Sequence, residues 1–196
     1  MSVDPTTVQR GVSPMMRVSP LLLILSLGCA RGEDARPRVL AENEIAIRSL
    51  MALWESGRTQ ELTGLFWPDA VYDDFPNQAQ YHGLEEIAGY VEHVHTWATG
   101  VTMGVTAVHV SDSGAVAEWV FSAIQHRPIP GQVPVATERE VVLNGVTIIE
   151  MDRGRIRRAA DYIDVLPLVL QLGGRAELPG GVVMELDLPP LSSNER

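Results

Sequence analysis

Asp161 is the residue with the clearest potential for chemistry, because its neighbours in the chain predict an otherwise apolar strand face. A strongly β-type run from Val141 to Met151 precedes it, and Asp152-Arg153-Gly154 then reads as a tight hairpin turn. Side chains alternate along a strand, which predicts one shared face for Arg157, Ala159, Asp161 and Ile163. A carboxylate on such a face is costly unless it lines a polar cavity. Asp161 is therefore either a group that acts in a cavity or a solvated residue on an exposed face.

Two earlier runs carry further polar groups and, with the hairpin, point to a family. They are Phe66-Trp67-Pro68-Asp69-Ala70-Val71-Tyr72-Asp73-Asp74-Phe75-Pro76 and Tyr81-His82-Gly83-Leu84-Glu85-Glu86-Ile87. Together with Pro128 to Thr137 and the strand ending Asp-Tyr-Ile-Asp, they resemble the nuclear transport factor 2-like superfamily. More narrowly, they resemble its SnoaL-like polyketide-cyclase and limonene-epoxide-hydrolase branch. The resemblance covers Glu42 to Gly173 and implies a fold that hosts enzymes and non-catalytic binders alike.

The epoxide-hydrolase branch implies roles for several residues. Its water-holding Asp, Tyr and Asn correspond to Asp161, Tyr72 and Asp74, whereas its acid-side Arg–Asp pair corresponds to Trp119 and Phe121. Epoxide opening needs a proton donor that two aromatic side chains cannot supply, so limonene-type hydrolysis is not expected. The resemblance instead implies two carboxylates and a phenol in a pocket walled by Trp119 and Phe121. Such a pocket suits proton abstraction from the carbon next to a carbonyl. It equally suits a binding site in which the polar groups orient an otherwise apolar ligand.

Other relatives imply further candidates. Steroid isomerases on this scaffold place their base at Asp74, but their oxyanion-stabilising Tyr and Asp fall at Leu50 and near Thr147, so that activity lacks its donors. Thr147 is nevertheless expected to line the pocket. His126 lies near a Thr–His pair of the polyketide cyclases at the pocket mouth, and its alternative is a histidine that faces a loop.

No cofactor or metal is expected. The chain has no glycine-rich phosphate loop and no nucleophile elbow, and His93 and His95 fall on different faces of one predicted helix. The formal net charge is −10, and the one basic run, at 153–158, is typical of a solvated strand edge. We therefore expect no nucleic-acid partner. The predicted partner is a small apolar molecule.

The first 28 residues resemble a bacterial lipoprotein signal. A short apolar run from Val18 to Leu27 follows Arg17, and Leu25-Ser26-Leu27-Gly28-Cys29 resembles a lipobox, with translation starting at Met1, Met15 or Met16. Cys29 is the only cysteine, which excludes an internal disulfide. We expect an exported protein anchored by a lipid on Cys29 to the cell or outer membrane. The alternatives are a cleaved secretory signal or a cytosolic product from a misplaced start.

We predict four regions along the whole chain: a signal at 1–28, a tether at 29–41, a domain at 42–173 and a Gly/Pro-rich tail at 174–196. Within the domain we expect helices at 42–56, 59–67 and 84–99, and strands at 70–75, 101–110, 115–126, 138–151 and 155–164. Helices followed by antiparallel strands indicate an α+β fold. The resemblance adds a cone-shaped, curved sheet wrapped on about three helices, with an internal pocket.

Three functions remain open at this stage. The first is a small-molecule-processing domain of the polyketide-cyclase type that uses acid/base chemistry, with Asp161 as base, Asp74 as partner and Tyr72 as positioning donor. The second is a lipoprotein that binds a small hydrophobic ligand without turnover. The third is a dimerisation module, since sheets of this fold often pair face to face as homodimers.

Overall fold

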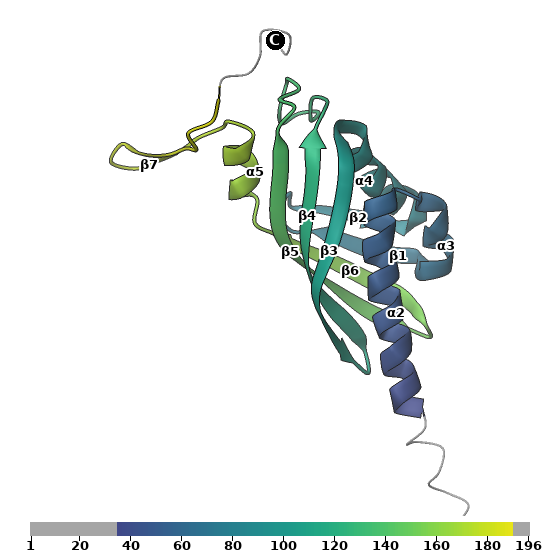
Figure 1. The fold of residues 1–196 in the computed structure, drawn as a ribbon. Helices are drawn as coiled ribbons and strands as arrows, with labels where there is room; N and C mark the ends of the chain where they lie inside the picture. The colour runs from purple at the N-terminus through teal and green to yellow at the C-terminus, as the bar shows by residue number, and fades with distance from the viewer. Residues whose placement is uncertain (1–34, 190–196) are drawn as a thin grey trace, which may run out of the picture.

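The computed structural model describes residues 35–189. One long helix and a set of shorter helical segments precede and flank a single large sheet (Figure 1). The helical elements are α2 (Ala35–Ser56), η1 (Thr59–Glu61), α3 (Leu62–Leu65), α4 (Gly83–Trp97) and α5 (Leu166–Gln171).

Six strands form the large sheet in the order β2-β1-β6-β5-β4-β3, and every neighbouring pair is antiparallel except the parallel pair β1 and β6. A small hairpin of β7 and β8 follows α5 and stands apart from the large sheet (Figure 1). The strands are β1 (Phe66–Asp74), β2 (Ala79–His82), β3 (Ala98–Ser111), β4 (Gly114–Gln125), β5 (Glu140–Asp152), β6 (Arg155–Ile163), β7 (Ala176–Leu178) and β8 (Val182–Met184).

The helices cover one face of the sheet. Helix α2 contacts β3 and β4, whereas α4 contacts β1 and β2, so the two helices lie over opposite parts of the same sheet (Figure 1). Helix α2 buries an apolar stripe that includes Ile47, Leu50, Met51 and Trp54, whereas Ile45, which was predicted to be buried, is exposed. The covered face is therefore the inner face, and it carries the core.

Local irregularities bend the sheet. The pairing of β3 with β4 shifts register between Thr99 and Thr102 and again between Val105 and Ala107. Such bulges increase twist and bend a strand, which lets the sheet curve around the helices. Between β5 and β6, Arg153 and Gly154 both have positive φ, as a two-residue type I′ hairpin turn requires. The structure thus confirms the α+β fold with a curved, mainly antiparallel sheet, and the turn predicted at Asp152-Arg153-Gly154.

Several element boundaries differ from the sequence prediction. Helix α2 begins at Ala35 rather than Glu42, because Pro37 falls in its first turn, where a missing N–H costs nothing. Phe66 belongs to β1 and not to the preceding helix, and Thr59 does not cap that helix but bonds Glu92 through its hydroxyl. The short strand β2 was not predicted, and the tail contributes β7 and β8.

The predicted signal at 1–28, including the lipidation site Cys29 that follows it, lies outside the described residues. Residues 35–41, which were expected to belong to the tether, are part of α2. Between residues 35 and 189, no helix combines the length and the apolar character that a membrane span needs.

Candidate active site

Asp161 lies on the inner face of β6 and is only 3% exposed. Its register partners are Thr147 on β5 and Asp74 on β1. Paired residues on neighbouring strands point to the same side of a sheet. The three side chains therefore form one row across the inner face. This placement answers the question left open by the sequence: Asp161 is a buried group of the core face and not a solvated surface residue.

Two hydroxyl groups donate hydrogen bonds to the Asp161 carboxylate. The Thr147 hydroxyl reaches Oδ1 at 2.6 Å, and the Tyr72 hydroxyl reaches Oδ2 at 2.9 Å. Tyr72 and Thr147 are themselves fully buried. Both carboxylate oxygens are thus held by uncharged donors from the strands on either side of β6.

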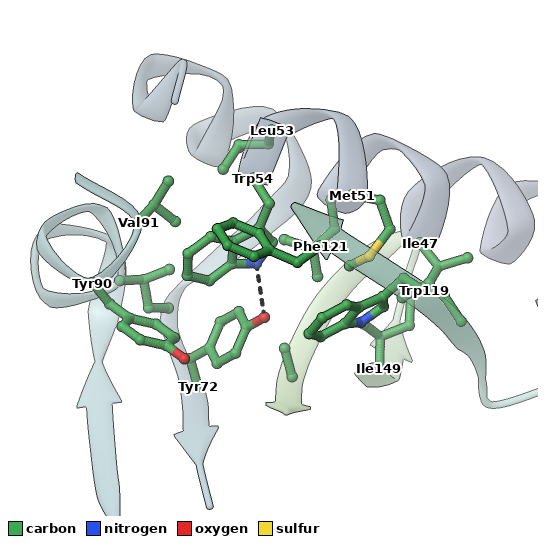
Figure 2. Close-up of a cluster of buried hydrophobic side chains, with 14 of the residues drawn as sticks. Ile47, Met51, Leu53, Trp54, Tyr72, Tyr90, Val91, Trp119, Phe121 and Ile149 are labelled. Atoms are coloured by element: carbon green, nitrogen blue, oxygen red, sulfur yellow. Dashed lines mark hydrogen bonds between the residues drawn. The ribbon is translucent and has the colours of Figure 1, made fainter. Parts of the chain in front are cut away.

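Each of these hydroxyls is in turn held by a tryptophan. Trp54 on α2 donates its indole N–H to the Tyr72 oxygen at 3.0 Å (Figure 2), and Trp119 on β4 donates to the Thr147 oxygen at 2.8 Å. An indole N–H can only donate, so each hydroxyl oxygen must accept from it and is left free to give its own proton to Asp161. Two tryptophans therefore orient both hydroxyl protons toward the carboxylate.

Burial and hydrogen bonding act in opposite directions on Asp161. The pKa of Asp161 is raised from its ordinary value of 3.8 to about 7. Burial is the main cause of the rise, and the charge of Asp74 contributes to it. The contacts with Thr147, Tyr72 and Tyr90 lower the pKa by favouring the charged form. A carboxylate balanced near neutral pH exchanges its proton readily, which is the property that a general base or acid needs.

Asp74 is completely buried at the end of β1 and binds the turn that follows it. Its Oδ2 accepts from the Asn77 side-chain amide at 2.8 Å, and its Oδ1 accepts from the Asn77 backbone N–H at 3.3 Å. Asp74 and Asp161 are register partners on neighbouring strands, so both carboxyl groups lie on the inner face of the sheet. Asp74 acts on Asp161 through its charge, which raises the pKa of Asp161.

Aromatic rings enclose this row of polar groups. Tyr90 on α4 packs edge-on against Trp54 and Tyr72, with ring centroids 4.9 and 5.4 Å apart, and stacks on Tyr81 at 4.4 Å (Figure 2 shows Tyr90, Trp54 and Tyr72). Sequence reasoning missed the part of Trp54 and Tyr90 at the site. The helical spacing predicted only that position 54 faces the core, and position 90 was not among the residues predicted to be buried. Nothing in such a pattern says which polar atom an indole or phenol meets.

Trp119 and Phe121, which were predicted to wall a pocket, are buried among the core residues. Their exposed fractions are 4% and 7%, and the ring of Phe121 lies against Trp97. The ring of Trp119 occupies the space where a side chain at Gly145 would begin. Only glycine at 145 therefore lets Trp119 reach Thr147.

Two predicted groups lie away from the site. His126 follows the end of β4, is exposed, and pairs with Glu138 through Nδ1 at 2.9 Å. This placement agrees with the alternative in which His126 faces a loop. Arg157 does not share the inner face with Asp161, because the pairing of β5 with β6 shifts register between Glu150 and Met151. Arg157 is exposed and pairs with Asp69 instead.

The site is closed by its own side chains. A groove of about 950 Å³ lies elsewhere, along α2, where Arg38, Glu42, Asn43 and Ala46 line it together with Met151 and Arg153. Residues 35–189 contain no group of three or more His, Cys, Asp or Glu side chains placed to hold a metal ion. Within that range every buried side-chain nitrogen and oxygen has a hydrogen-bond partner. A ligand can therefore reach Asp161 only if some of the enclosing rings move.

Comparison with known families places this domain. Residues 47–159 match the model of the SnoaL-like domain. The chain belongs to the SnoaL-like family. The matched segment runs from the middle of α2 to β6 and so includes Trp54, Tyr72, Asp74, Trp119 and Thr147, and it stops two residues before Asp161. No functionally curated protein matches the chain.

Several solved structures share the fold. TsrD from Streptomyces laurentii is 23% identical, with a TM-score of 0.60 over 68% of this chain and 96% of its own. A protein from Jannaschia sp. CCS1, classed with the SnoaL-like polyketide cyclases, is 15% identical, with a TM-score of 0.62 over 68% and 93% of the two chains. A protein from Catenulispora acidiphila with a ketosteroid isomerase-like fold, solved with trimethylamine, is 19% identical, with a TM-score of 0.55 over 64% and 90%. At these identities the likeness concerns the fold.

Proposed function

We propose that this SnoaL-like domain processes a small apolar molecule by acid/base chemistry that needs neither metal nor nucleotide, with Asp161 as the base. The observation that carries the proposal is the pair of hydroxyls from Tyr72 and Thr147, each oriented by an indole toward one carboxylate oxygen. The family supports it, since the matched structures include proteins classed as polyketide cyclases.

The chemistry follows from the position of the protons. Asp161 as a carboxylate takes a proton from the carbon next to a ligand carbonyl, and the enolate that forms needs a hydrogen-bond donor. Tyr72 and Thr147 already donate to Asp161, so protonation of the carboxylate frees these hydroxyl protons for another acceptor. In this proposal the two hydroxyls position Asp161 before the transfer and stabilise the enolate after it. Burial, with a smaller contribution from the charge of Asp74, keeps the pKa of Asp161 high.

Deuterium exchange tests the proposal without knowledge of the natural substrate. The flat, apolar ketone 2-tetralone is incubated in heavy water with the full chain or with Asp161→Asn, and NMR follows deuterium entering the carbon next to the carbonyl. We expect faster exchange with the wild type than with the variant. Equal rates for the two proteins would argue against Asp161 as a base.

Binding without turnover is the second candidate function, and the closed site favours it. Both oxygens of Asp161 are occupied by protein donors, and the side chains around it are buried. A domain that only holds a hydrophobic ligand needs no free acceptor at its centre. In that case 2-tetralone binds and no protein-dependent exchange is seen.

We further propose that a lipid on Cys29 anchors the domain at the periplasmic face of a membrane, as the lipobox-like run predicts.

Pairing of two copies through their sheets also remains a prediction. The exposed Ile124 and Val142 on the outer sheet face support it, because they leave apolar surface uncovered in one copy.

A further inference from the structure

A hollow of about 590 Å³ opens between β2 and α4 and shares the rings of Tyr81 and Tyr90 with the site described above. Its volume lies within the range of small-molecule pockets. Tyr90 forms one of its walls, so the hollow and Asp161 lie near the same ring. The lining residues are Gln80, Tyr81, Glu86, Gly89, Tyr90 and His93.

The stacked rings of Tyr81 and Tyr90 give this hollow a flat aromatic wall. Their planes differ by only 13°, and Tyr81 is partly exposed while Tyr90 is almost fully buried. Tyr90 also packs edge-on against Trp54 and Tyr72. The wall is therefore held rigidly from behind. A planar ring from outside can join a wall of this kind by offset stacking or by an edge-to-face contact.

The charge around the hollow selects against anions. Glu86 lies on its lining, and its carboxylate accepts the backbone N–H of His82 at 2.7 Å. The carboxyl groups of Asp161 and Asp74 act on Tyr90 from the inner side, where with burial they raise the pKa of Tyr90 well above its usual range. Tyr90 thus stays an uncharged phenol, with the carboxyl groups of Glu86, Asp74 and Asp161 around it. A ring that carries a carboxylate or sulfonate is disfavoured there.

We propose that the hollow between β2 and α4 is a binding subsite for an uncharged planar aromatic ring, stacked against Tyr81 and Tyr90 on the outer side of the Asp161 site. The inference rests on the proposed function, because it assigns the ring system of the ligand to this place.

Two glycines allow a matched test of the subsite. A β carbon at Gly89 of α4, or at Gly64 of α3, would meet no other atom within 4 Å. Gly89 lines the proposed subsite, whereas Gly64 lines the larger groove beside α2. Leucine is more favourable than glycine inside a helix, so neither substitution is expected to unfold the domain. Gly89→Leu fills the subsite, and Gly64→Leu is its control.

The probe is 2-naphthol, and equilibrium dialysis against the full chain measures its binding. We expect Gly89→Leu to weaken binding by about tenfold or more and Gly64→Leu to leave it unchanged. Charged 2-naphthalenesulfonate should bind the wild type more weakly than 2-naphthol. Absence of wild-type binding, or equal binding by Gly89→Leu, would overturn the subsite.

A second pair of variants tests the aromatic wall itself. Tyr81→Phe keeps the ring and should bind 2-naphthol as the wild type does, whereas Tyr81→Leu removes the ring and should bind more weakly. Equal binding by these two variants would contradict stacking.

Dialysis detects binding without turnover, so its outcome is independent of the exchange assay. If Asp161→Asn exchanges 2-tetralone as fast as the wild type while Gly89→Leu loses 2-naphthol, the acid/base proposal fails and the subsite stands.

Discussion

The ring of Trp119 on β4 lies directly over Gly145, its register partner on β5, and fills the place of a side chain there. This position brings the indole N–H to the hydroxyl of Thr147, two residues along β5 on the same face. A single residue without a side chain thus determines where the hydrogen-bond chain through Thr147 to Asp161 begins. The geometry of the site depends on Gly145 although that residue has no chemistry of its own.

Gly145→Ala should therefore displace Trp119 and break its bond to Thr147. A methyl group forced into packed surroundings costs on the order of 1–3 kcal/mol of unfolding free energy. Chemical denaturation measures this loss. Gly104→Ala on β3 is the control, because a β carbon there makes only an ordinary contact with a backbone oxygen at 3.7 Å. Equal stability of the two variants would show that Trp119 is not held as described.

Asp161→Asn should make the stability of the protein less dependent on pH. The folded pKa of about 7 exceeds the ordinary value of 3.8, so the folded state binds more protons between these pH values. The free energy of unfolding then falls as pH rises through this window, by an amount on the order of a few kcal/mol, and levels off above pH 7. Asparagine carries no charge and removes this fall. Above pH 7 the variant therefore gains stability from the loss of the buried charge. It also loses about 1–3 kcal/mol, because its amide NH2 group cannot accept the hydrogen bond that one of the two hydroxyls donates.

Thermal melts between pH 4 and pH 8 measure the effect. Asp69→Asn is the control: it removes an exposed carboxylate paired with Arg157 and should keep the wild-type pH dependence. Destabilisation of Asp161→Asn at pH 8, with deuterium exchange retained, would make Asp161 a structural residue and contradict its role as a base. The pairing of Arg157 with Asp69 already removes one structural explanation, an ion pair between Arg157 and Asp161.

The sequence predicted most of the sheet and the central acid, because alternation with a period of two is strong in β5 and β6. It failed for Arg157, since one register shift between Glu150 and Met151 moves that residue off the inner face. Alternation alone does not reveal such a bulge. The four-residue strand β2 was missed for a related reason: it is too short to show a period.

The hydrogen-bond partners of Asp161 were only partly predictable. Tyr72 and Thr147 were named through family resemblance. The contact of Thr147 with Asp161 follows from the antiparallel pairing of β5 with β6. The contact of Tyr72 depends on the parallel pairing of β1 with β6, which brings together two residues that are 89 positions apart in the chain. Trp54 looked like a core residue, and it is one. That its N–H meets a phenol is a matter of tertiary packing between α2 and β1, and helical spacing does not encode it.

Cys29→Ser should release the protein from membranes. A lipid-modified cysteine partitions with membranes, and serine cannot carry the thioether-linked lipid. Fractionation of cells that make the full chain, followed by immunoblotting, compares the wild type with Cys29→Ser and with the neighbouring control Ala30→Ser. We expect only Cys29→Ser to move to the soluble fraction. Unchanged fractionation of all three proteins would contradict lipidation at Cys29.

Tyr72→Phe should raise the pKa of Asp161 above that of the wild type. The Tyr72 hydroxyl donates to Oδ2 and favours the charged carboxylate, so its removal makes ionisation harder. The variant also leaves the buried N–H of Trp54 without its acceptor, which costs about 1–3 kcal/mol of unfolding free energy. NMR titration of a ¹³C-labelled Asp161 carboxyl should show a later midpoint. The fall of stability with rising pH should likewise extend to higher pH than in the wild type.

Tyr162→Phe is the matched control for this change. Tyr162 neighbours Asp161 in the chain but is exposed on the outer face, where its ring stacks on Phe75. Loss of its hydroxyl should therefore leave both the Asp161 titration and the stability as they are. If Tyr72→Phe titrates like Tyr162→Phe, the Tyr72 hydroxyl does not hold the carboxylate in solution. In that case the hydrogen-bond chain from Trp54 to Asp161 could not position the base.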